Sequence, residues 1–365
     1  MSSRAIWRPE PPIRFGLIGA SAIAKKHVAA LNRMPDATVA AVADLDLDRA
    51  VPLAETFGAR PYRDYKEMLA NEELDVVSVL TPSGSHARIA IDVARSGRHV
   101  VVEKPMSLQL EEADLQIRAC AENKVRMFVV LQNRFSQPVM QVRQALDAGR
   151  FGKLVSGSVR LRWCRDQAYY DASPWRGTWA RDGGVFCNQA CHHLDLMLWM
   201  LGDVESVCAM KATRLVDIEA EDTGVAILRF TNGALGVIEA TTAWRPKDLE
   251  GSFSLAGECG SVEIGGFVVD QLKHWQFAEE APQDADVFER YGSNPDVFAW
   301  QHEQYLRDVT HALTTGEPAL VEVTEGRRTV ELINAIYESA ETGREVNLRF
   351  RPNHSRLGKT VSAVV

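Results

Sequence analysis

The strongest constraint on the fold is an alternation of short apolar runs with helix-like segments in the first part of the chain. Apolar runs recur at 13–19, 38–44, 75–81 and 100–102, and each is followed by alanines and leucines at helical spacing. A further helix and strand extend the pattern to about residue 133. Because the runs are apolar on both faces, they fit parallel strands with helices on both sides. The sequence therefore predicts a doubly wound α/β domain over residues 13–133.

A different pattern begins at Val155, where long runs such as SGSVRLRW and GALGVIEATT alternate polar with apolar residues. Turn sequences such as Thr231-Asn232-Gly233 separate these runs, as in antiparallel hairpins. One helix interrupts the runs and two more close the chain. We therefore predict an α+β domain over residues 134–350 with a large, open, mixed sheet, followed by a tail at 351–365.

Charge and composition exclude several classes of protein. The 41 basic and 49 acidic residues give a net charge of −8, which argues against a nucleic-acid partner. No apolar run approaches the roughly 20 residues that span a bilayer, and the first residues lack a secretory signal, so we expect a cytoplasmic protein without a membrane partner. We expect free thiols and no metal; the alternative is a zinc site at Cys187, Cys191 and His192-His193.

The predicted open sheet carries apolar residues that need a covering. A sheet with helices on one face must leave its other face in water or bury it on a partner. Trp163, Ile227, Val237 and Ile238 are candidates for that face. We predict a homo-oligomer formed through this sheet, and the alternative is a face wetted by its polar side chains.

The end of the first strand has the form of a dinucleotide-binding turn. Gly19 to Ala24 reads G-x-S-x-x-A and opens a helix, where backbone N–H groups and the helix dipole favour a pyrophosphate. Asp44 ends the second strand, where a carboxylate binds the ribose of NAD and repels the 2′-phosphate of NADP; the alternative is a helix cap. Thr81-Pro82-Ser83 and Glu103-Lys104-Pro105 end later strands at the same edge of the sheet. The candidates are Gly19, Ser21, Ala22, Ile23, Asp44, Thr81, Pro82, Ser83, Glu103 and Lys104.

Two side chains suit proton chemistry. Lys104 lies between Glu103 and Pro105 at the end of an apolar strand, where its ammonium would hold a substrate hydroxyl and stabilise negative charge on the oxygen. His192 lies one turn after Asn188 on a helix and is a proton acceptor near neutral pH; the alternative is a structural histidine. Which of the two is the base stays open, because coupled groups share a titration.

Several motifs together resemble a known family. GLIGASAIAKKH, TPSGSHARIA, VVVEKPMS, QNRF and the helix G-G-x-x-x-N-x-x-x-H resemble the dehydrogenases related to glucose-fructose oxidoreductase and inositol dehydrogenase (Gfo/Idh/MocA). The resemblance runs from about Ile13 to about Phe350. It implies an NAD-binding Rossmann domain, a C-terminal sheet domain that forms dimers or tetramers, and oxidation of a sugar or cyclitol hydroxyl.

The resemblance also implies roles for individual residues. Lys104 and His192 match the family's catalytic lysine and histidine, and the motifs add His86, Gln132 and Arg134 to the cofactor candidates. The carboxylate that is often found four residues before the histidine is Asn188 here. This departure removes a charge from the site and puts a proton relay through that position in doubt.

One stretch narrows the expected substrate. WCRDQAYYDASPWRGTWARDGGVFCNQACHHLDLMLWMLG most resembles dehydrogenases that oxidise the 3-hydroxyl of UDP-N-acetylglucosaminuronate for bacterial surface-polysaccharide and lipopolysaccharide synthesis. Arg165 and Arg176 suit a carboxylate and a diphosphate better than Arg160 and Arg162, which share one strand face; the alternative is a solvated basic stripe. The substrate candidates are Lys104, Arg165, Tyr169, Trp175, Arg176, Asn188, Gln189 and His192.

Three other functions stay open. The chain could oxidise a free sugar or an inositol, in which case UDP would not be required. It could be an NAD-dependent glycosidase, which releases a leaving group with no net change in the cofactor. It could be a non-catalytic dinucleotide sensor, although Lys104 and His192 argue against that function.

Overall fold

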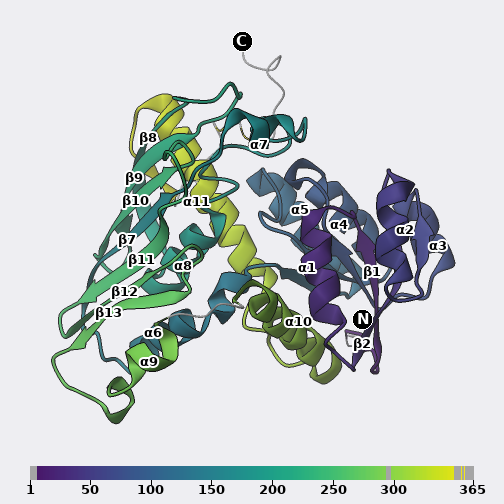
Figure 1. The fold of residues 1–365 in the computed structure, drawn as a ribbon, viewed down its shortest axis with the longest axis horizontal. Coiled ribbons are helices and arrows are strands. Elements are labelled where there is room, and N and C mark those ends of the chain that lie inside the picture. The colour runs from purple at the N-terminus through teal and green to yellow at the C-terminus, as the bar shows by residue number, and fades with distance from the viewer. Residues whose placement is uncertain (1–5, 293–296, 349–354, 356, 358–365) are drawn as a thin grey trace. The chain divides into compact units, whose positions relative to one another are not determined.

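The computed structural model describes residues 6–292, 297–348, 355 and 357, and its contacts divide the chain into two compact units (Figure 1). The first unit runs to Gln132 and adds Phe298–Arg327, and the second holds Asn133–Val297 and the residues from Arg328 onward. The domain limits drawn from the sequence stay predictions. They differ from the units at 298–327, which we assigned to the second domain. Most of the predicted tail lies outside the described residues.

The first unit contains the predicted parallel sheet covered by helices. Its six strands lie in the order β3-β2-β1-β4-β5-β6, and all pairs are parallel. The central strands β4 and β5 are buried along their whole length, which explains their continuous apolar sequence. The strands are β1 (Ile13–Ile18), β2 (Ala37–Ala43), β3 (Arg60–Tyr62), β4 (Val76–Val79), β5 (His99–Val102) and β6 (Met127–Val129).

Helices follow the strands as the alternation predicts. Asp46 and Asp64 cap two of them, because each carboxylate accepts a hydrogen bond from the backbone N–H two residues later. The helices are α1 (Ala22–Leu31), α2 (Leu47–Glu55), α3 (Tyr65–Asn71), η1 (Ser83–Ser85), α4 (His86–Arg95), α5 (Leu110–Asn123) and α10 (Val297–Thr315).

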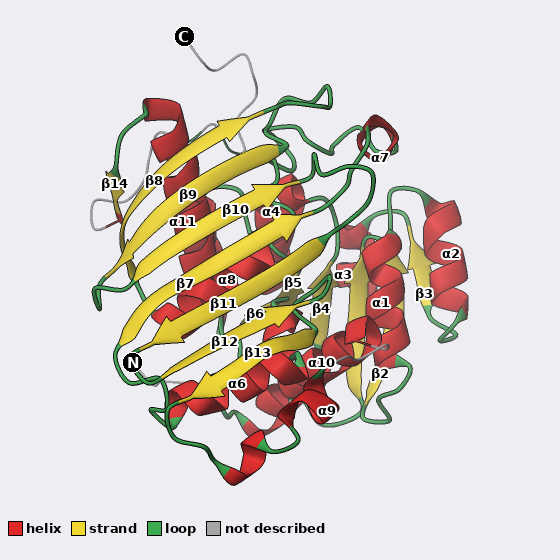
Figure 2. Cartoon of the chain, turned by 60° about the vertical axis from the view of Figure 1, so that its left-hand side comes forward, coloured by secondary structure: helices red, strands yellow, loops and turns green. Residues whose placement is uncertain are grey.

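The second unit is built on an eight-stranded sheet in the order β13-β12-β11-β7-β10-β9-β8-β14 (Figure 2). The β10–β7 pair is parallel and the other pairs are antiparallel, so the predicted mixed sheet is confirmed. Its strands are β7 (Leu154–Arg162), β8 (Val204–Ala212), β9 (Thr223–Phe230), β10 (Leu235–Thr241), β11 (Glu250–Gly257), β12 (Gly260–Gly265), β13 (Gln271–Phe277) and β14 (Val346–Asn347). Its helices are η2 (Gln132–Phe135), α6 (Gln137–Asp147), α7 (Gln167–Asp171), α8 (Cys191–Leu201), η3 (Pro282–Asp284), α9 (Val287–Tyr291) and α11 (Val323–Thr342).

Helices α8 and α11 lie behind one face of this sheet, and the other face is open (Figure 2). Ile227 and Val237 are 61% and 51% exposed on the open face, as predicted. Ile238 was assigned to the wrong face, because it follows Val237 in the same strand and therefore points the opposite way, where it is fully buried. Trp163 was also assigned wrongly: it stacks on Phe267 and contacts His193 of helix α8.

The remaining composition-based predictions concern membranes and cysteines. Among the described residues, no helix combines the length and apolar character that a membrane span requires. All six cysteines are free thiols.

Candidate active site

Gly19 forms the turn between strand β1 and helix α1. Its φ is +101°, and a Cβ atom there would lie 2.7 Å from the carbonyl oxygen of Leu80. Glycine is therefore required by both the backbone conformation and the close approach of a neighbouring strand. Ser21 and Ala22 are exposed at the start of helix α1, and the Ser21 side chain makes no capping hydrogen bond. The first backbone N–H groups of this helix therefore suit an anion.

Asp44 holds the same turn from the end of strand β2. Its carboxylate accepts hydrogen bonds from the Ala20 and Asp46 backbone N–H groups, at 2.7 and 2.8 Å. The cap of helix α2 is Asp46, not Asp44, which removes the alternative interpretation of Asp44 as a helix cap. A half-exposed carboxylate at this strand end can accept hydrogen bonds from a ribose diol.

His86 joins two turns at the carboxyl edge of the sheet. Its Nδ1 lies 2.8 Å from the Pro105 carbonyl oxygen, and its Nε2 lies 2.6 Å from the Thr81 carbonyl oxygen. The ring is buried, and burial lowers its pKa. His86 therefore supports the turns that carry Thr81 and Lys104, and its predicted contact with the cofactor stays a prediction.

Lys104 follows a buried carboxylate. Glu103 accepts hydrogen bonds from the Lys104 backbone N–H and pairs with His27 Nε2 at 3.0 Å. Burial would raise the pKa of Glu103, but the hydrogen bond and charge of His27, with the charges of His302 and Lys104, lower it. The Lys104 side chain is half-buried. Strand β5 is therefore followed by a lysine whose backbone N–H is held by the Glu103 carboxylate.

The same carboxylate belongs to a group with the composition of a metal site. His27, Glu103 and His302 place their ligand atoms within 4.8 Å of one another. The His27–Glu103 hydrogen bond and the nearby Lys104 cation explain this group as a buried hydrogen-bonded cluster without an ion. The prediction that the protein has no metal is not tested by this arrangement.

The last two cofactor candidates lie just beyond strand β6. Gln132 is buried at the end of the first unit. Arg134 belongs to the second unit, where Nε and Nη2 donate to the two oxygens of Asp195 at 2.8 and 2.6 Å. Both side chains are only 1% exposed, so the guanidinium supports helix α8. Asp195 is thus held by Arg134.

Helix α8 separates two adjacent histidines. His192 is half-buried, whereas His193 is fully buried against Trp163 and beside Gly251. Burial lowers the pKa of His193 to about 4, so this ring is neutral at physiological pH. Of the two, His192 is therefore the one that can exchange a proton with a ligand.

The turn before helix α8 rests on a buried carboxyl that the sequence analysis missed. Glu221 Oε1 accepts hydrogen bonds from the Phe186 backbone N–H at 3.0 Å and the Tyr337 hydroxyl at 2.8 Å. The Gly184 backbone N–H donates to that hydroxyl at 3.0 Å, and a Cβ on Gly184 would lie 2.2 Å from Glu221 Cδ. Burial raises the pKa of Glu221 to about 7. Gly184 thus lets the turn approach the carboxyl that fixes it.

The predicted substrate residues of the preceding segment form a cation–aromatic cluster. The Arg165 and Arg176 guanidinium carbons lie 5.4 and 4.1 Å from the centre of the Tyr169 ring. Arg176 also lies 5.6 Å from the Trp175 ring, and its buried Nε makes no hydrogen bond to any described residue. Arg165 is paired with Asp248 at 2.9 Å. Arg176 Nη1 donates to the Tyr169 carbonyl oxygen at 2.6 Å, and the cavity of about 570 Å³ beside it is also lined by three acidic residues, Asp171, Asp217 and Glu219.

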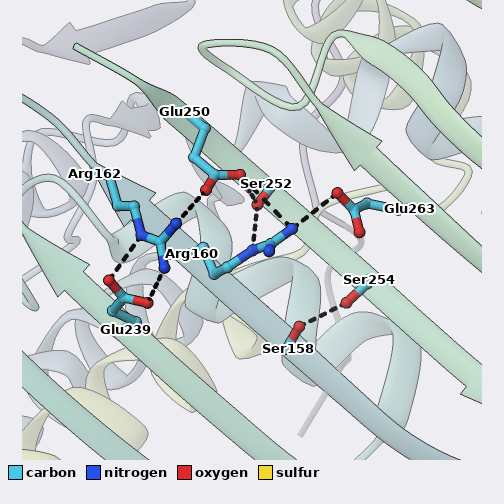
Figure 3. Close-up of polar contacts among 8 residues, drawn as sticks. All are labelled: Ser158, Arg160, Arg162, Glu239, Glu250, Ser252, Ser254 and Glu263. Atoms are coloured by element: carbon cyan, nitrogen blue, oxygen red, sulfur yellow. Dashed lines mark hydrogen bonds and ion pairs between the residues drawn. The ribbon is translucent and has the colours of Figure 1, made fainter.

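Arg160 and Arg162 serve a different purpose, as Figure 3 shows. They point to the open face of the sheet, where Arg162 binds both oxygens of Glu239 at 2.7 and 2.6 Å. Arg160 pairs with Glu263 at 2.8 Å, and Arg162 also reaches Glu250 at 3.0 Å. These glutamates pair with both arginines, and the ranking of Arg165 and Arg176 above them as substrate ligands stays a prediction.

Comparison with known proteins identifies the family. The sequence model described as "Oxidoreductase family, NAD-binding Rossmann fold" matches residues 13–131, and the model described as "GFO/IDH/MocA C-terminal domain" matches residues 139–263. The chain belongs to the Gfo/Idh/MocA family. The resemblance seen in the sequence is thereby confirmed, and the first unit is an NAD-binding Rossmann domain of an oxidoreductase.

Two solved structures match nearly the whole chain, and a curated relative matches a shorter part of it. The WlbA dehydrogenase from Bordetella pertussis, solved with NADH and UDP-GlcNAcA, is 39% identical, with a TM-score of 0.89 over 95% of this chain and 99% of that one. The WlbA dehydrogenase from Chromobacterium violaceum, with the same ligands, is 36% identical, with a TM-score of 0.88 and the same coverage. Myo-inositol 2-dehydrogenase of Thermotoga maritima is 31% identical over 62% of this chain and 68% of its own length.

The residues of the first unit fit the NAD that the Gfo/Idh/MocA family binds. The Gly19 turn leaves the backbone N–H groups at the start of helix α1 to a pyrophosphate, and Asp44 stands where the ribose hydroxyls need an acceptor. A 2′-phosphate near this carboxylate would be repelled. The chain's own side chains therefore favour NAD over NADP.

Proposed function

We propose that this protein oxidises a secondary hydroxyl of a nucleotide-linked sugar acid with NAD, and that the hydroxyl is the 3-hydroxyl of UDP-N-acetylglucosaminuronate. The product is the 3-keto sugar. The observation that carries this proposal is the similarity of the whole chain, at 39% identity, to a WlbA dehydrogenase solved with NADH and UDP-GlcNAcA. An alternative supported by a relative at 31% identity is the oxidation of an inositol.

Two residues carry the proposed proton chemistry. Bound NAD supplies a hydride acceptor. Lys104 donates a hydrogen bond to the sugar hydroxyl, and its positive charge stabilises the oxygen as negative charge develops there. His192 accepts the hydroxyl proton at a ring nitrogen, because a neutral imidazole has a ring nitrogen with a lone pair that can bind a proton. Its neighbour His193 is buried and plays no part in this step.

The proposed substrate is an anion, and the second unit offers cations for it. The planar guanidinium of Arg176 suits the diphosphate or the uronate carboxylate. Arg165 and Arg176 both lie against the Tyr169 ring, but Arg165 also pairs with Asp248. We therefore expect Arg165 to contribute less than Arg176 to binding of the anionic substrate. A UDP-sugar substrate is also consistent with a cytoplasmic location and with polysaccharide synthesis, and both stay predictions.

The test compares three substrates at saturating NAD. We expect the purified protein to convert UDP-N-acetylglucosaminuronate to a product lighter by two hydrogens, detected by mass spectrometry. Free N-acetylglucosaminuronate and myo-inositol should give no saturable turnover. NADH that co-purifies with the protein would mask the reaction. A parallel reaction therefore contains 2-oxoglutarate as an oxidant for bound NADH, and the protein is used in excess over the sugar so that a single turnover is detectable. Turnover of myo-inositol, with none of UDP-N-acetylglucosaminuronate, would instead show that the protein is an inositol dehydrogenase.

We also propose that copies of the chain associate through the open sheet face. Ile227 and Val237 are cross-strand neighbours on this face, and Met210 and Leu235 beside them are 76% and 52% exposed. A contiguous apolar patch of this kind is typical of an interface.

Ile227→Glu should therefore weaken self-association, because it places a charge in the centre of the apolar patch. Light scattering after size-exclusion chromatography measures the mass of the particle. The matched control is Leu115→Glu, which changes an apolar side chain of similar exposure (49%) on helix α5. Monomeric wild-type protein, or equal masses for both variants and wild type, would contradict the proposed interface.

A further inference from the structure

Glu221 anchors the turn before helix α8 at three consecutive residues. The Val185 N–H donates to the Glu221 backbone carbonyl oxygen at 3.0 Å, and the Phe186 N–H donates to the side-chain Oε1 at 3.0 Å. The Tyr337 hydroxyl donates to the same Oε1 at 2.8 Å and accepts from the Gly184 N–H at 3.0 Å. Glu221 therefore holds the turn through its backbone, through its carboxyl and through Tyr337.

This turn determines where helix α8 begins. The Asn188 N–H donates to the Gly184 carbonyl oxygen at 2.9 Å, and the Ala190 N–H donates to the Val185 carbonyl oxygen at 2.8 Å. The Ala190 carbonyl oxygen then accepts hydrogen bonds from the first turn of helix α8, which carries His192. Backbone hydrogen bonds thus connect the residues that Glu221 holds to the helix turn of His192.

The second carboxyl oxygen of Glu221 lies in a site without a donor. The side chain is 1% exposed, and both donors reach Oε1, whereas Oε2 makes no hydrogen bond to any described residue. Oε2 faces Gly184, where a Cβ atom would lie 2.3 Å from it. A carboxylate would leave negative charge on this oxygen away from water, which is costly. A neutral carboxyl avoids that charge.

The charged neighbours do not outweigh this cost. Lys211 of strand β8 favours the Glu221 carboxylate, but it also lies 3.9 Å from Glu341 of helix α11. Tyr337 faces Glu221 from the same helix, with Cys187 of the turn near it, and burial raises the pKa of Tyr337 so that it stays neutral. Burial therefore raises the pKa of Glu221 from 4.5 to about 7, against Lys211 and the two hydrogen bonds.

We propose that Glu221 is a positioning residue for His192 that acts through its own proton: the neutral carboxyl holds the turn before helix α8, and the carboxylate releases it. This inference rests on the proposed function, and it deepens that function by giving the reaction a control behind the site. The release follows because both oxygens of a carboxylate need donors. Water can reach Oε2 only if the turn moves away from the carboxyl.

Glu221→Gln should abolish the resulting pH dependence. The amide keeps a carbonyl oxygen for Phe186 and Tyr337 but cannot ionise. With a pKa of about 7, the neutral fraction of Glu221 falls from about 90% at pH 6 to about 10% at pH 8. The kcat of Glu221→Gln divided by that of wild type, with UDP-N-acetylglucosaminuronate, should therefore be near 1 at pH 6 and rise about tenfold by pH 8. This ratio cancels titrations that both proteins share.

Lys211→Met separates this titration from general structural support. The Lys211 charge lowers the pKa of Glu221, so its removal should move the wild-type transition to higher pH. Methionine keeps an apolar side chain against the Trp179 ring, whose centre lies 4.5 Å from the ammonium. The matched control is Glu258→Gln, which makes the same change at an exposed glutamate between strands β11 and β12. It should keep the pH dependence of wild type.

Hydrogen exchange tests the turn without the reaction. Deuterium uptake of the segment 183–191 is followed by mass spectrometry and corrected for the intrinsic pH dependence of exchange. It should accelerate in wild type between pH 6 and pH 8 and stay slow in Glu221→Gln. The buried strand β4 is the internal reference and should keep its protection in both proteins.

Urea unfolding gives a second measurement that needs no substrate. Below the ordinary pKa of 4.5, Glu221 is neutral in the folded and the unfolded chain. As the pH rises from 4.5 to about 7, only the unfolded chain ionises, so wild type should lose stability relative to Glu221→Gln. Above that range both states are ionised, and the difference in unfolding midpoint should stay constant.

Several results would overturn the inference. A kcat ratio that is the same at pH 6 and pH 8, or a Glu221→Gln protein that does not fold at pH 6, would indicate structural support alone. A transition that Lys211→Met leaves in place would assign it to another group. Equal exchange of segment 183–191 in wild type and Glu221→Gln at pH 8 would show that the turn is not released. A wild type that does not oxidise the sugar would refute the proposed function, and hydrogen exchange and unfolding would then decide this inference.

Discussion

Lys104→Ala should lower kcat for the proposed sugar substrate by about 10³-fold, the range expected when a group that transfers or stabilises a proton is removed. Lys104 is the cation at the end of strand β5, between the buried residues Glu103 and Pro105. Alanine removes the ammonium but leaves the backbone bonds of this turn. NADH affinity should therefore change little, and the loss should fall on the chemical step, as measured by steady-state kinetics.

The matched control is Lys66→Ala, which removes an exposed lysine from helix α3. It should keep the activity of wild type. Lys104→Arg tests whether charge alone suffices: because guanidinium is larger and does not give up its proton, we expect it to remain far below wild type. Activity of Lys104→Ala within a few-fold of wild type would place the proton chemistry on another residue.

Arg134→Met should lower the free energy of unfolding by about 3–5 kcal/mol, because it removes the positive charge that balances a buried carboxylate. Arg134 and Asp195 are each 1% exposed and share two hydrogen bonds. The Arg134 guanidinium also lies 4.9 Å from the Trp199 ring. Urea unfolding followed by circular dichroism measures the effect.

The double variant Arg134→Met/Asp195→Leu should recover most of the lost stability, because it replaces both buried charges by apolar groups. Arg143→Met is the matched control. It removes a partly exposed arginine that pairs with Asp147 and lies 5.4 Å from the same Trp199 ring, and it should cost about 1 kcal/mol or less. Equal losses for Arg134→Met and Arg143→Met would mean that burial of the Arg134–Asp195 pair adds nothing.

The strand and helix pattern of the first unit was predictable because its signals are local. Each buried strand is a short apolar run, and Gly19 and Asp44 mark the turn and strand end that a dinucleotide requires. Lys104 could be singled out because it stands out against its apolar neighbours, whereas His192 was identified from its spacing after Asn188 and only the burial of His193 separates the two rings.

Groups whose partners are distant in the chain were not predictable from the sequence. Glu221 depends on Tyr337, which is 116 residues away. This pairing cannot be read from one segment alone. The faces of Val237 and Ile238 were not predictable for another reason. Both are apolar and adjacent in the chain, so only the register of strand β10 decides which of them faces the helices.

The return of residues 298–327 to the first unit has a consequence for synthesis on the ribosome. Arg126 donates to the Ala312 carbonyl oxygen at 2.5 Å and pairs with Glu322 at 2.6 Å, and Asp114 binds Arg327. These partners emerge only after nearly all of the chain has been translated. The nucleotide-binding unit begins first but is completed late, so a nascent chain that stops near residue 290 lacks part of it.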